Sequence, residues 1–294
     1  MASGGAGAYQ LVTPGDLIVE DDTDFLKGHG TFSRDGALFA SVCGVVRRVN
    51  RLISVVPLKS RYQGDVGDVV VGRVKDVGSK RWKVDVNSFQ HAVLLLSAIN
   101  LPGGVQRRRT YEDELNMRQF FQEDDLLCAE VQQFFQQDGS MALQTRSARY
   151  GKLTHGQLVE VDPSLVKRCK QHIVSLPFGG LELILGRNGY IWLSTQRVAK
   201  AAVTSSDGAS ASSSSEAPPA TSGGPVTDEE RECICRARNA ILALASQQIL
   251  ISPETIQDVY EDSVEMSLSA ADMLDPEYTQ SLTARAFARK SETF

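Results

Sequence analysis

The stretch LELILGRNGYIWL, residues 181–193, constrains the fold more strongly than any other part of the sequence. Its residues alternate with a period of two on both sides of Asn188-Gly189, and such alternation is typical of β-strands. Asn-Gly is the favoured pair for a two-residue type I′ turn, because both central residues of that turn must accept a positive φ. We therefore predict a β-hairpin centred on Asn188-Gly189.

The same stretch contains a G-x-x-G sequence, from Gly186 to Gly189, that supports a competing interpretation. In RNA-binding KH domains a G-x-x-G loop joins two helices and clamps the backbone of the nucleic acid. The flanks of this G-x-x-G do not have helical spacing. In a KH-type fold the clamp would lie near residues 169–172, where the sequence has no glycine to let the backbone approach a phosphate. We predict that any KH-like unit here has lost its clamp loop.

Residues 8–62 are divided by closely spaced turn signals into short apolar runs, two of which flank Asn50-Arg51. Runs of this length and spacing are typical of a small sandwich or barrel. We predict an N-terminal β domain over these residues, built as a sandwich or barrel-like structure.

Residues 65–147 contain five predicted strands and one short helix. Three strands lie at 68–77, 81–87 and 92–97, a helix at 111–121, and two more strands flank Asp138-Gly139. An Asp-Gly pair between apolar runs is a strong hairpin signal. Five strands with one short helix match the OB-fold, a small barrel that binds oligonucleotides on one face.

Residues 148–294 mix strands and helices. Asp162-Pro163 follows a predicted strand and predicts a helix from Ser164 to about Ser175. After the hairpin, a capping-box sequence begins a helix at Thr227, and Ser252-Pro253 begins another. We predict a divergent KH-like α+β domain with C-terminal helices, so the fold class of the whole chain is mainly β plus α+β.

Residues 201–225 interrupt this last domain with mostly Ser, Ala, Gly and Pro and with no large apolar residue. Such a segment cannot bury enough surface to offset the entropy of ordering it. We predict a disordered insertion.

The charge of the chain is segregated, although its net value is only −5. Residues 26–200 carry 25 Lys and Arg against 16 Asp and Glu, whereas residues 201–294 carry 6 against 15. A basic middle region favours an anionic partner, with an ordinary solvated surface as the alternative. No apolar run could span a bilayer and no signal peptide begins the chain, so we expect an intracellular protein without a membrane partner.

Catalytic and metal-binding signals are weak. The five cysteines are odd in number and lack C-x-x-C spacing, which favours reduced thiols over disulfides or a zinc site. Asp21, Asp22 and Asp24 are the densest early carboxylates, but they lie between turn signals, unlike the rigid carboxylates of two-metal nucleases. No nucleotide-binding fingerprint occurs. We predict a protein that is not an enzyme and has no cofactor or metal.

An ordered set of motifs carries a resemblance to a known family. VGDVVVGRV (66–74) and LQTRS (143–147) resemble parts of an S1 RNA-binding barrel, and GRNGYIW (186–192) is similar to a hairpin of exosome cap proteins. Further motifs in the same order are LVTPGD (11–16), GHGT (28–31), RYQGDVGDVVVGRV (61–74), KRWKVD (80–85) and LLLSAINLPGGVQRRR (94–109). Together they resemble the cap subunits of the eukaryotic RNA exosome that contain S1 and KH domains.

The resemblance implies a function and a set of partners. Such a subunit sits with two other cap proteins on a six-membered ring related to phosphorolytic ribonucleases. It is not itself a nuclease, and it guides single-stranded RNA toward a separate catalytic subunit for 3′-to-5′ processing and decay, including maturation of ribosomal RNA. The implied location is the nucleus and nucleolus, and also the cytoplasm.

The predicted barrel supplies the main candidates for RNA contact, which are Arg73, Lys75, Lys80, Arg81 and Lys83. Cations attract phosphates, and an aromatic ring can stack on a base without selecting its identity. Strand alternation places Arg81 and Lys83 on one face and Trp82 on the other, so we expect Trp82 in the core, with base stacking as its alternative. Phe89 and His91 are further candidates for base stacking.

Two more basic groups are candidates for RNA contact. Arg107, Arg108 and Arg109 lie on a predicted loop and can bind phosphate oxygens, or can pair with the acidic residues just downstream or with an acidic subunit. The other group lies on the predicted helix at 164–175 and is weaker, since an exposed helix face needs no function. Its members are Lys167, Arg168 and Lys170.

For assembly we expect the segment DFLKGHGTF, residues 24–32, to form a protein interface. Apolar anchors among turn-forming glycines suit such an interface, and the candidates are Phe25, Leu26, His29 and Phe32. The alternative is that they are ordinary core residues. For the whole chain, the alternatives to a cap subunit are a free-standing RNA-binding regulator and a ribonuclease.

Overall fold

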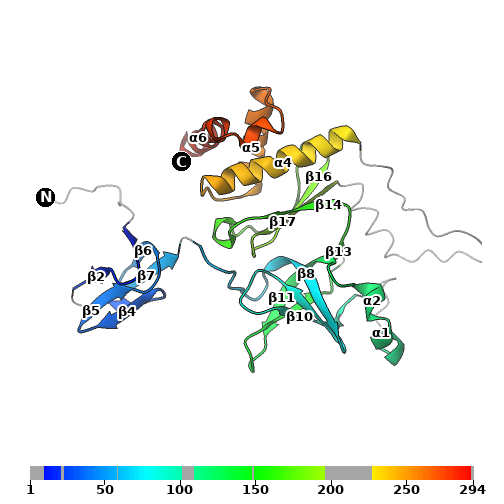
Figure 1. Cartoon of the computed structure of the whole chain (residues 1–294), viewed down its shortest axis with the longest axis horizontal. Helices are drawn as coiled ribbons and strands as arrows, with labels where there is room; N and C mark the ends of the chain where they lie inside the picture. Colours follow the sequence, from blue (N-terminus) through cyan, green and yellow to red (C-terminus); the bar gives the residue numbers. More distant parts are fainter. Residues whose placement is uncertain are drawn as a thin grey trace, which may run out of the picture. The chain divides into compact units, whose positions relative to one another are not determined.

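The computed structural model describes residues 10–20, 23–57, 59–100, 109–147, 149–195 and 227–292. It divides into two compact units, Met1–Ser60 and Arg61–Phe294, which Figure 1 draws. The predicted insertion at 201–225 lies outside the described residues. Among the helices that the structure describes, none is long and apolar enough to cross a membrane.

The first unit is a small all-β structure, as predicted. One sheet has the strand order β1-β6-β7-β3 and the other has the order β2-β5-β4. The strands are β1 (Leu11–Val12), β2 (Leu17–Val19), β3 (Leu26–Lys27), β4 (Thr31–Arg34), β5 (Ala37–Ala40), β6 (Gly44–Val49) and β7 (Leu52–Pro57). Asn50 turns the chain between β6 and β7 with a φ of 54°, and a small cluster around Val12, Ala40 and Val55 forms the apolar centre.

The second unit begins with a β-barrel. Its sheet has the order β12-β10-β9-β8-β11-β13, and an additional pairing between β11 and β12 closes it, so the predicted OB-like fold is confirmed. Its strands are β8 (Val69–Gly78), β9 (Arg81–Asp85), β10 (Ala92–Ile99), β11 (Leu126–Phe134), β12 (Met141–Thr145) and β13 (Gly151–Leu153). The predicted single helix is two short helices, α1 (Tyr111–Leu115) and α2 (Met117–Phe120).

Trp82 belongs to the core of this barrel, as strand alternation predicts. Its side chain is fully buried, and its indole Nε1 donates a hydrogen bond to the Phe121 carbonyl at 3.1 Å. The two rings pack edge to face with their centroids 5.5 Å apart. Trp82 therefore joins β9 to the end of α2 and is not available to stack on a base.

A four-stranded antiparallel sheet follows, with the order β14-β17-β16-β15, and α4 lies across one of its faces (Figure 1). The elements are β14 (Gly156–Glu160), β15 (Ile173–Ser175), β16 (Leu181–Leu185), β17 (Tyr190–Thr195), α4 (Asp228–Ser246), α5 (Pro253–Glu265) and α6 (Pro276–Glu292). Thr227 and Ser252 cap α4 and α5 by accepting backbone N–H bonds, each at 3.3 Å, so both predicted helix starts are confirmed.

The predicted helix from Ser164 to Ser175 is wrong. Only Pro163–Leu165 forms a 3₁₀ turn, and residues 166–172 continue as a loop into β15. The Lys167 N–H donates to the Ile251 carbonyl at 3.0 Å, and the Ile251 N–H donates to the Leu165 carbonyl at 2.7 Å. This pairing with a distant part of the chain overrides the local helical pattern.

The predicted hairpin at Asn188-Gly189 is confirmed, but its turn is not type I′. Gly189 has a φ of 85°, whereas Asn188 does not have a positive φ. The Gly189 N–H donates to the Gly186 carbonyl at 3.1 Å, and the Gly186 N–H donates to the Tyr190 carbonyl at 3.0 Å. This pattern belongs to a three-residue loop that ends in a left-handed glycine.

The side chain of Asn188 joins the hairpin to the barrel. The Asn188 side-chain nitrogen donates to the Val71 and Val86 carbonyls at 2.7 and 3.2 Å, and its oxygen accepts from the Val71 N–H at 3.3 Å. A Cβ atom at Gly186 would overlap the Tyr190 carbonyl oxygen and would lie 2.6 Å from Asn188 Oδ1, so glycine is needed at this position. The G-x-N-G sequence therefore holds two parts of the second unit together.

Candidate nucleic-acid interface

The β8–β9 hairpin carries five cations, which we call the hairpin cations: Arg73, Lys75, Lys80, Arg81 and Lys83. They do not all share one surface. Arg73 is half-buried and shares a strand face with Val69 and Val71, which pack against the sheet of β14–β17. Lys75 occupies a bulge in the pairing of β8 with β9 and is exposed.

Arg81 and Lys83 lie together on the outer face of β9. Both are exposed, and they stand opposite Leu95 and Val93 of β10. In OB-fold barrels the second and third strands form the oligonucleotide-binding face, and here these strands are β9 and β10. The structure therefore brings the two strongest candidates from the sequence onto the expected binding face.

Two of the hairpin cations already have carboxylate partners. Lys80 Nζ lies 3.0 Å from Glu114 Oε1, and Lys83 Nζ lies 3.2 Å from Asp76 Oδ2. Since both lysines are largely exposed, each ion pair is weak and can exchange for a phosphate. Arg81 has no carboxylate within ion-pair distance among the described residues, so it is the most available cation on this face.

Phe89 offers an aromatic surface beside the barrel. Its side chain is 75% exposed, and the guanidinium of Arg61 lies over its ring at 5.6 Å from the centroid. His91 is also exposed. An exposed ring backed by a cation can stack on a base while the cation approaches a phosphate.

Arg109 does not behave as predicted. Its Nε donates to the Leu96 carbonyl at 2.9 Å and its Nη2 donates to the Ile99 carbonyl, so it is bound to β10. At least two of the donors of Arg109 are therefore bound to the protein's own backbone. Arg107 and Arg108 lie outside the described residues.

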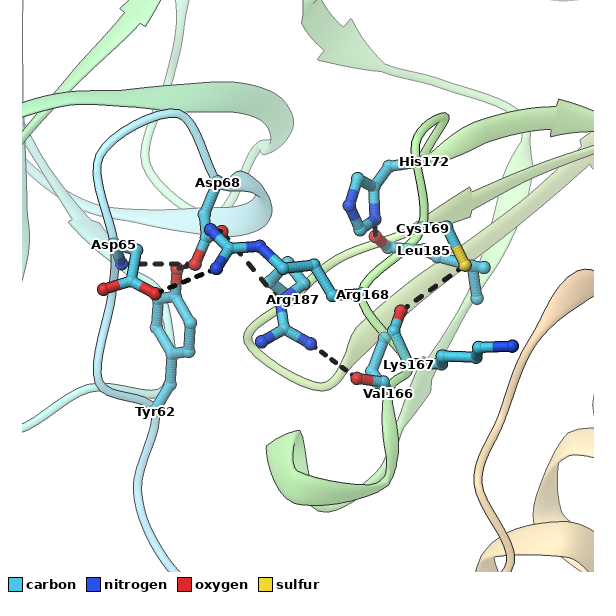
Figure 2. A network of polar contacts seen from close by, with 10 residues as sticks. All are labelled: Tyr62, Asp65, Asp68, Val166, Lys167, Arg168, Cys169, His172, Leu185 and Arg187. Atoms are coloured by element: carbon cyan, nitrogen blue, oxygen red, sulfur yellow. Dashed lines mark hydrogen bonds and ion pairs between the residues drawn. The ribbon is translucent and has the colours of Figure 1, made fainter. Parts of the chain in front are cut away.

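Arg168 is also occupied by the protein, in a network around the buried carboxylate of Asp68 (Figure 2). Asp68 accepts from Tyr62 Oη at 2.8 Å and from Arg168 Nη2 at 3.0 Å, and Arg168 also pairs with Asp65 at 3.3 Å. Burial, together with the bond to Asp68, raises the pKa of Tyr62. Lys167 points away from this network in Figure 2, so Lys167 and Arg168 do not face the same surface.

Comparisons with known proteins place this geometry in a family. Three family models match: RRP4, S1 domain, at residues 61–133; KH domain at 156–199; and Exosome complex exonuclease RRP4 N-terminal region at 11–49. Exosome complex component RRP4 of Bos taurus is 46% identical to this chain, and the match covers 96% of this chain and 90% of that protein. The chain belongs to the RRP4 family.

Other members of the RRP4 family show the same likeness. Exosome complex component rrp4 of Schizosaccharomyces pombe is 45% identical, and the match covers 87% of this chain and 77% of that protein. The homolog from Arabidopsis thaliana is 43% identical, with coverage of 94% and 85%. The resemblance that the sequence motifs carry is thereby confirmed.

In this RRP4-family chain the predicted interface residues of the first unit differ in exposure. Phe25 is half-buried with the Arg48 guanidinium 4.4 Å from its ring centroid, and Phe32 stacks on Phe39 at 5.6 Å. Leu26 is 63% exposed and His29 is exposed. Leu26 and His29 therefore remain candidates for a protein interface. Phe32 remains a candidate through the exposed part of its ring, whereas the half-buried ring of Phe25 contributes to the packing of the first unit.

The contacts of three residues in the second unit of this RRP4-family chain were not predicted from the sequence. Arg61 lies over the ring of Phe89, Asn188 joins the hairpin to the barrel, and Arg149 lines a cleft in the second unit. The G-x-N-G sequence marks a turn at Asn188, and a family motif begins at Arg61, but neither shows what the side chain contacts.

Replacing Trp82 with phenylalanine should lower the free energy of unfolding by about 2 kcal/mol, because the buried Phe121 carbonyl loses its donor and a small cavity opens. Urea unfolding followed by circular dichroism measures this change. At a urea concentration at which the wild-type and variant proteins are both folded, the RNA affinity of the variant should stay within about twofold of that of the wild type. A large loss of affinity with unchanged stability would instead support the stacking role.

Proposed function

We propose that this chain is a non-catalytic, RNA-binding cap subunit of the RNA exosome. It stabilises the six-membered RNase PH-like ring and guides single-stranded RNA into the channel, toward a separate nuclease. The RNA is processed or degraded from 3′ to 5′, and the products include mature ribosomal RNA. The observation that carries the proposal is the outer face of β9, where Arg81 and Lys83 are exposed on the barrel of an RRP4-family chain.

The chemistry of this face suits a conduit that accepts many RNAs. Cations that contact phosphates give affinity without reading base identity, and a ring such as that of Phe89 stacks on any base. The rigid pairing of β9 with β8 and β10 holds Arg81 and Lys83 at a fixed spacing. These features support capture of single strands without sequence preference.

Exposed apolar side chains of the first unit support a role in assembly. Leu11, Leu26 and Leu52 are each more than 40% exposed, and Leu26 pairs directly with Leu52 across β3 and β7. Apolar groups exposed together favour a protein contact, and we assign that contact to the ring. The subunit would act wherever the exosome acts, in the nucleus and nucleolus and in the cytoplasm.

A ribonuclease is the second candidate, because one matching family model carries the word exonuclease in its name. Among the described residues, no group of three or more His, Cys, Asp or Glu side chains is placed to hold a metal ion. We expect labelled RNA to stay intact when the purified chain is added with magnesium or with inorganic phosphate. Degradation under either condition, lost on mutation of this chain, would favour the nuclease.

Purification of the tagged full chain from its own cells tests the proposal. Mass spectrometry should identify ring subunits related to phosphorolytic ribonucleases, the other cap proteins and a catalytic nuclease. Recovery of the chain as a monomer with nanomolar, sequence-specific RNA binding would instead favour a free-standing regulator.

A further inference from the structure

A cleft lies between the barrel and the sheet of β14–β17, both within the second unit. Its volume is about 300 Å³, and it is lined by residues 66–69, 149–150 and 168–173. Figure 2 shows part of its wall, with Arg168, Cys169 and His172 on the loop that leads to β15. A volume of this size is at the lower limit of small-ligand sites, so the cleft can accept one group about as large as a nucleotide.

Two cations in the lining of this cleft have no ion-pair partner among the described residues, although Arg149 acts at longer range on the half-buried carboxyl of Glu182, whose pKa burial raises and Arg149 lowers by a smaller amount. Arg168 is paired with Asp68 and Asp65 at 3.0 and 3.3 Å. Arg149 and Lys170 are exposed, and neither has a carboxylate within ion-pair distance in the described part of the chain. Phosphate oxygens are the natural partners of such cations.

His172 adds a hydrogen-bond acceptor beside these cations. Its Nδ1 lies 3.0 Å from the Leu185 carbonyl, which can only accept, so Nδ1 carries the proton. Burial lowers the pKa of His172, and this effect outweighs that of the hydrogen bond to the Leu185 carbonyl, which raises it. Arg187 and Arg168 lower the pKa further, whereas Asp68 raises it. The neutral ring therefore has a lone pair on Nε2, which can accept from a hydroxyl group.

Tyr150 supplies an apolar wall to the same cleft. Its ring packs against a cluster that includes Val69, Val71 and Trp192, and its side chain is half-buried. Burial, followed by Glu130, raises the pKa of Tyr150 to about 12, so the ring stays a neutral phenol. A neutral ring at the edge of a cationic cleft is a suitable surface for a ribose or a base.

We propose that this cleft binds one nucleotide of a single-stranded RNA. Arg149 and Lys170 hold phosphate oxygens, and His172 Nε2 accepts the ribose 2′-hydroxyl. The inference rests on the proposed function, because it assigns a second contact for the same RNA, away from the outer face of β9. An acidic peptide is the alternative occupant, because its carboxylates can pair with the same two cations, but it has no equivalent of the ribose 2′-hydroxyl.

Salt dependence of RNA binding tests the phosphate contacts. Anisotropy of a fluorescein-labelled oligouridylate, titrated with the full chain over a salt series, gives the slope of log affinity against log salt. We expect Arg149→Ala with Lys170→Ala to reduce the steepness of this slope by about 1.4, because each phosphate contact on a single strand contributes about 0.7. The matched control, Arg34→Ala with Arg231→Ala, removes the same charge outside the cleft and should leave the slope unchanged.

The variant His172→Asn tests the ribose contact. Asparagine can still donate to the Leu185 carbonyl, but it offers nothing at the position of Nε2. The preference for oligouridylate over oligodeoxyuridylate should fall by about 3- to 10-fold, which is the value of one hydrogen bond. An unchanged preference, with an unchanged melting temperature, contradicts this contact.

The outcomes distinguish a failure of the cleft assignment from a failure of the proposed function. If the wild-type chain binds RNA and the cleft variant has the slope of its control, the cleft assignment is wrong and the proposed function stands. If the wild-type chain does not bind the oligouridylate at low salt, the proposed function itself fails. Binding of an oligoglutamate peptide that requires Arg149 and Lys170, with the RNA slope unchanged, would assign the cleft to an acidic peptide instead.

Discussion

The variant Asn188→Ala should unfold at much lower urea than the wild-type chain, with a loss of about 3 to 4 kcal/mol in the free energy of unfolding. Asn188 is fully buried, and its side chain makes three hydrogen bonds to the barrel, two to Val71 and one to Val86. Alanine leaves those buried backbone groups without partners, and each such group costs about 1 to 3 kcal/mol. Tryptophan fluorescence measures the transition, since Trp82 lies in the barrel and Trp192 in the neighbouring sheet.

Two further variants separate this role from a general effect of losing an amide. Asn116→Ala removes an exposed amide and should change stability by less than about 0.5 kcal/mol. Asn188→Asp keeps the volume and one acceptor but places a charged oxygen against the Val71 and Val86 carbonyls, so it should be at least as damaging as alanine. An Asn188→Ala protein as stable as the Asn116→Ala protein would show that the hairpin does not hold the barrel.

The second large effect is expected at the outer face of β9. Charge reversal by Arg81→Glu with Lys83→Glu should weaken binding of an oligouridylate on the order of 30-fold or more at about 0.1 M salt. Two lost phosphate contacts account for most of this loss, and repulsion by the new carboxylates adds to it. The difference from wild type should shrink as salt rises, because added ions screen exposed charges.

The matched control for this variant changes the same net charge elsewhere. Arg34→Glu with Arg231→Glu alters two exposed arginines, one in the first unit and one on α4, and should weaken binding only a few-fold. Melting temperatures are compared as well, because Lys83→Glu faces Asp76 and removes a 3.2 Å ion pair. Equal losses in the two charge-reversed proteins would mean that only net charge matters.

The sequence predicts this fold best where a pattern is local. Strand alternation around Trp82 correctly places its indole in the core, because side chains on a strand must alternate between faces. The hairpin at Asn188-Gly189 is also correct as an element. Its turn type is wrong, and the side-chain bonds of Asn188 to Val71, which span 117 positions of the sequence, were not predicted.

Predictions fail where a distant segment decides the structure. The loop at 166–172 pairs with Ile251 in place of forming a helix, so Lys167, Arg168 and Lys170 do not share a helix face. The guanidinium of Arg168 is hydrogen-bonded to Asp65 and Asp68, which lie about one hundred positions earlier in the sequence. The sequence therefore identifies the cations, whereas the fold is needed to show which of them are free to contact RNA.

Photocross-linking of 4-thiouridine RNA to the full chain, with the adducts mapped by mass spectrometry, tests most directly whether the second unit grips single strands. We predict adducts on the outer face of β9 and around Phe89, within residues 61–91, and in the cleft, within residues 149–173. Adducts confined to residues 10–57 or to α4–α6 would contradict this account.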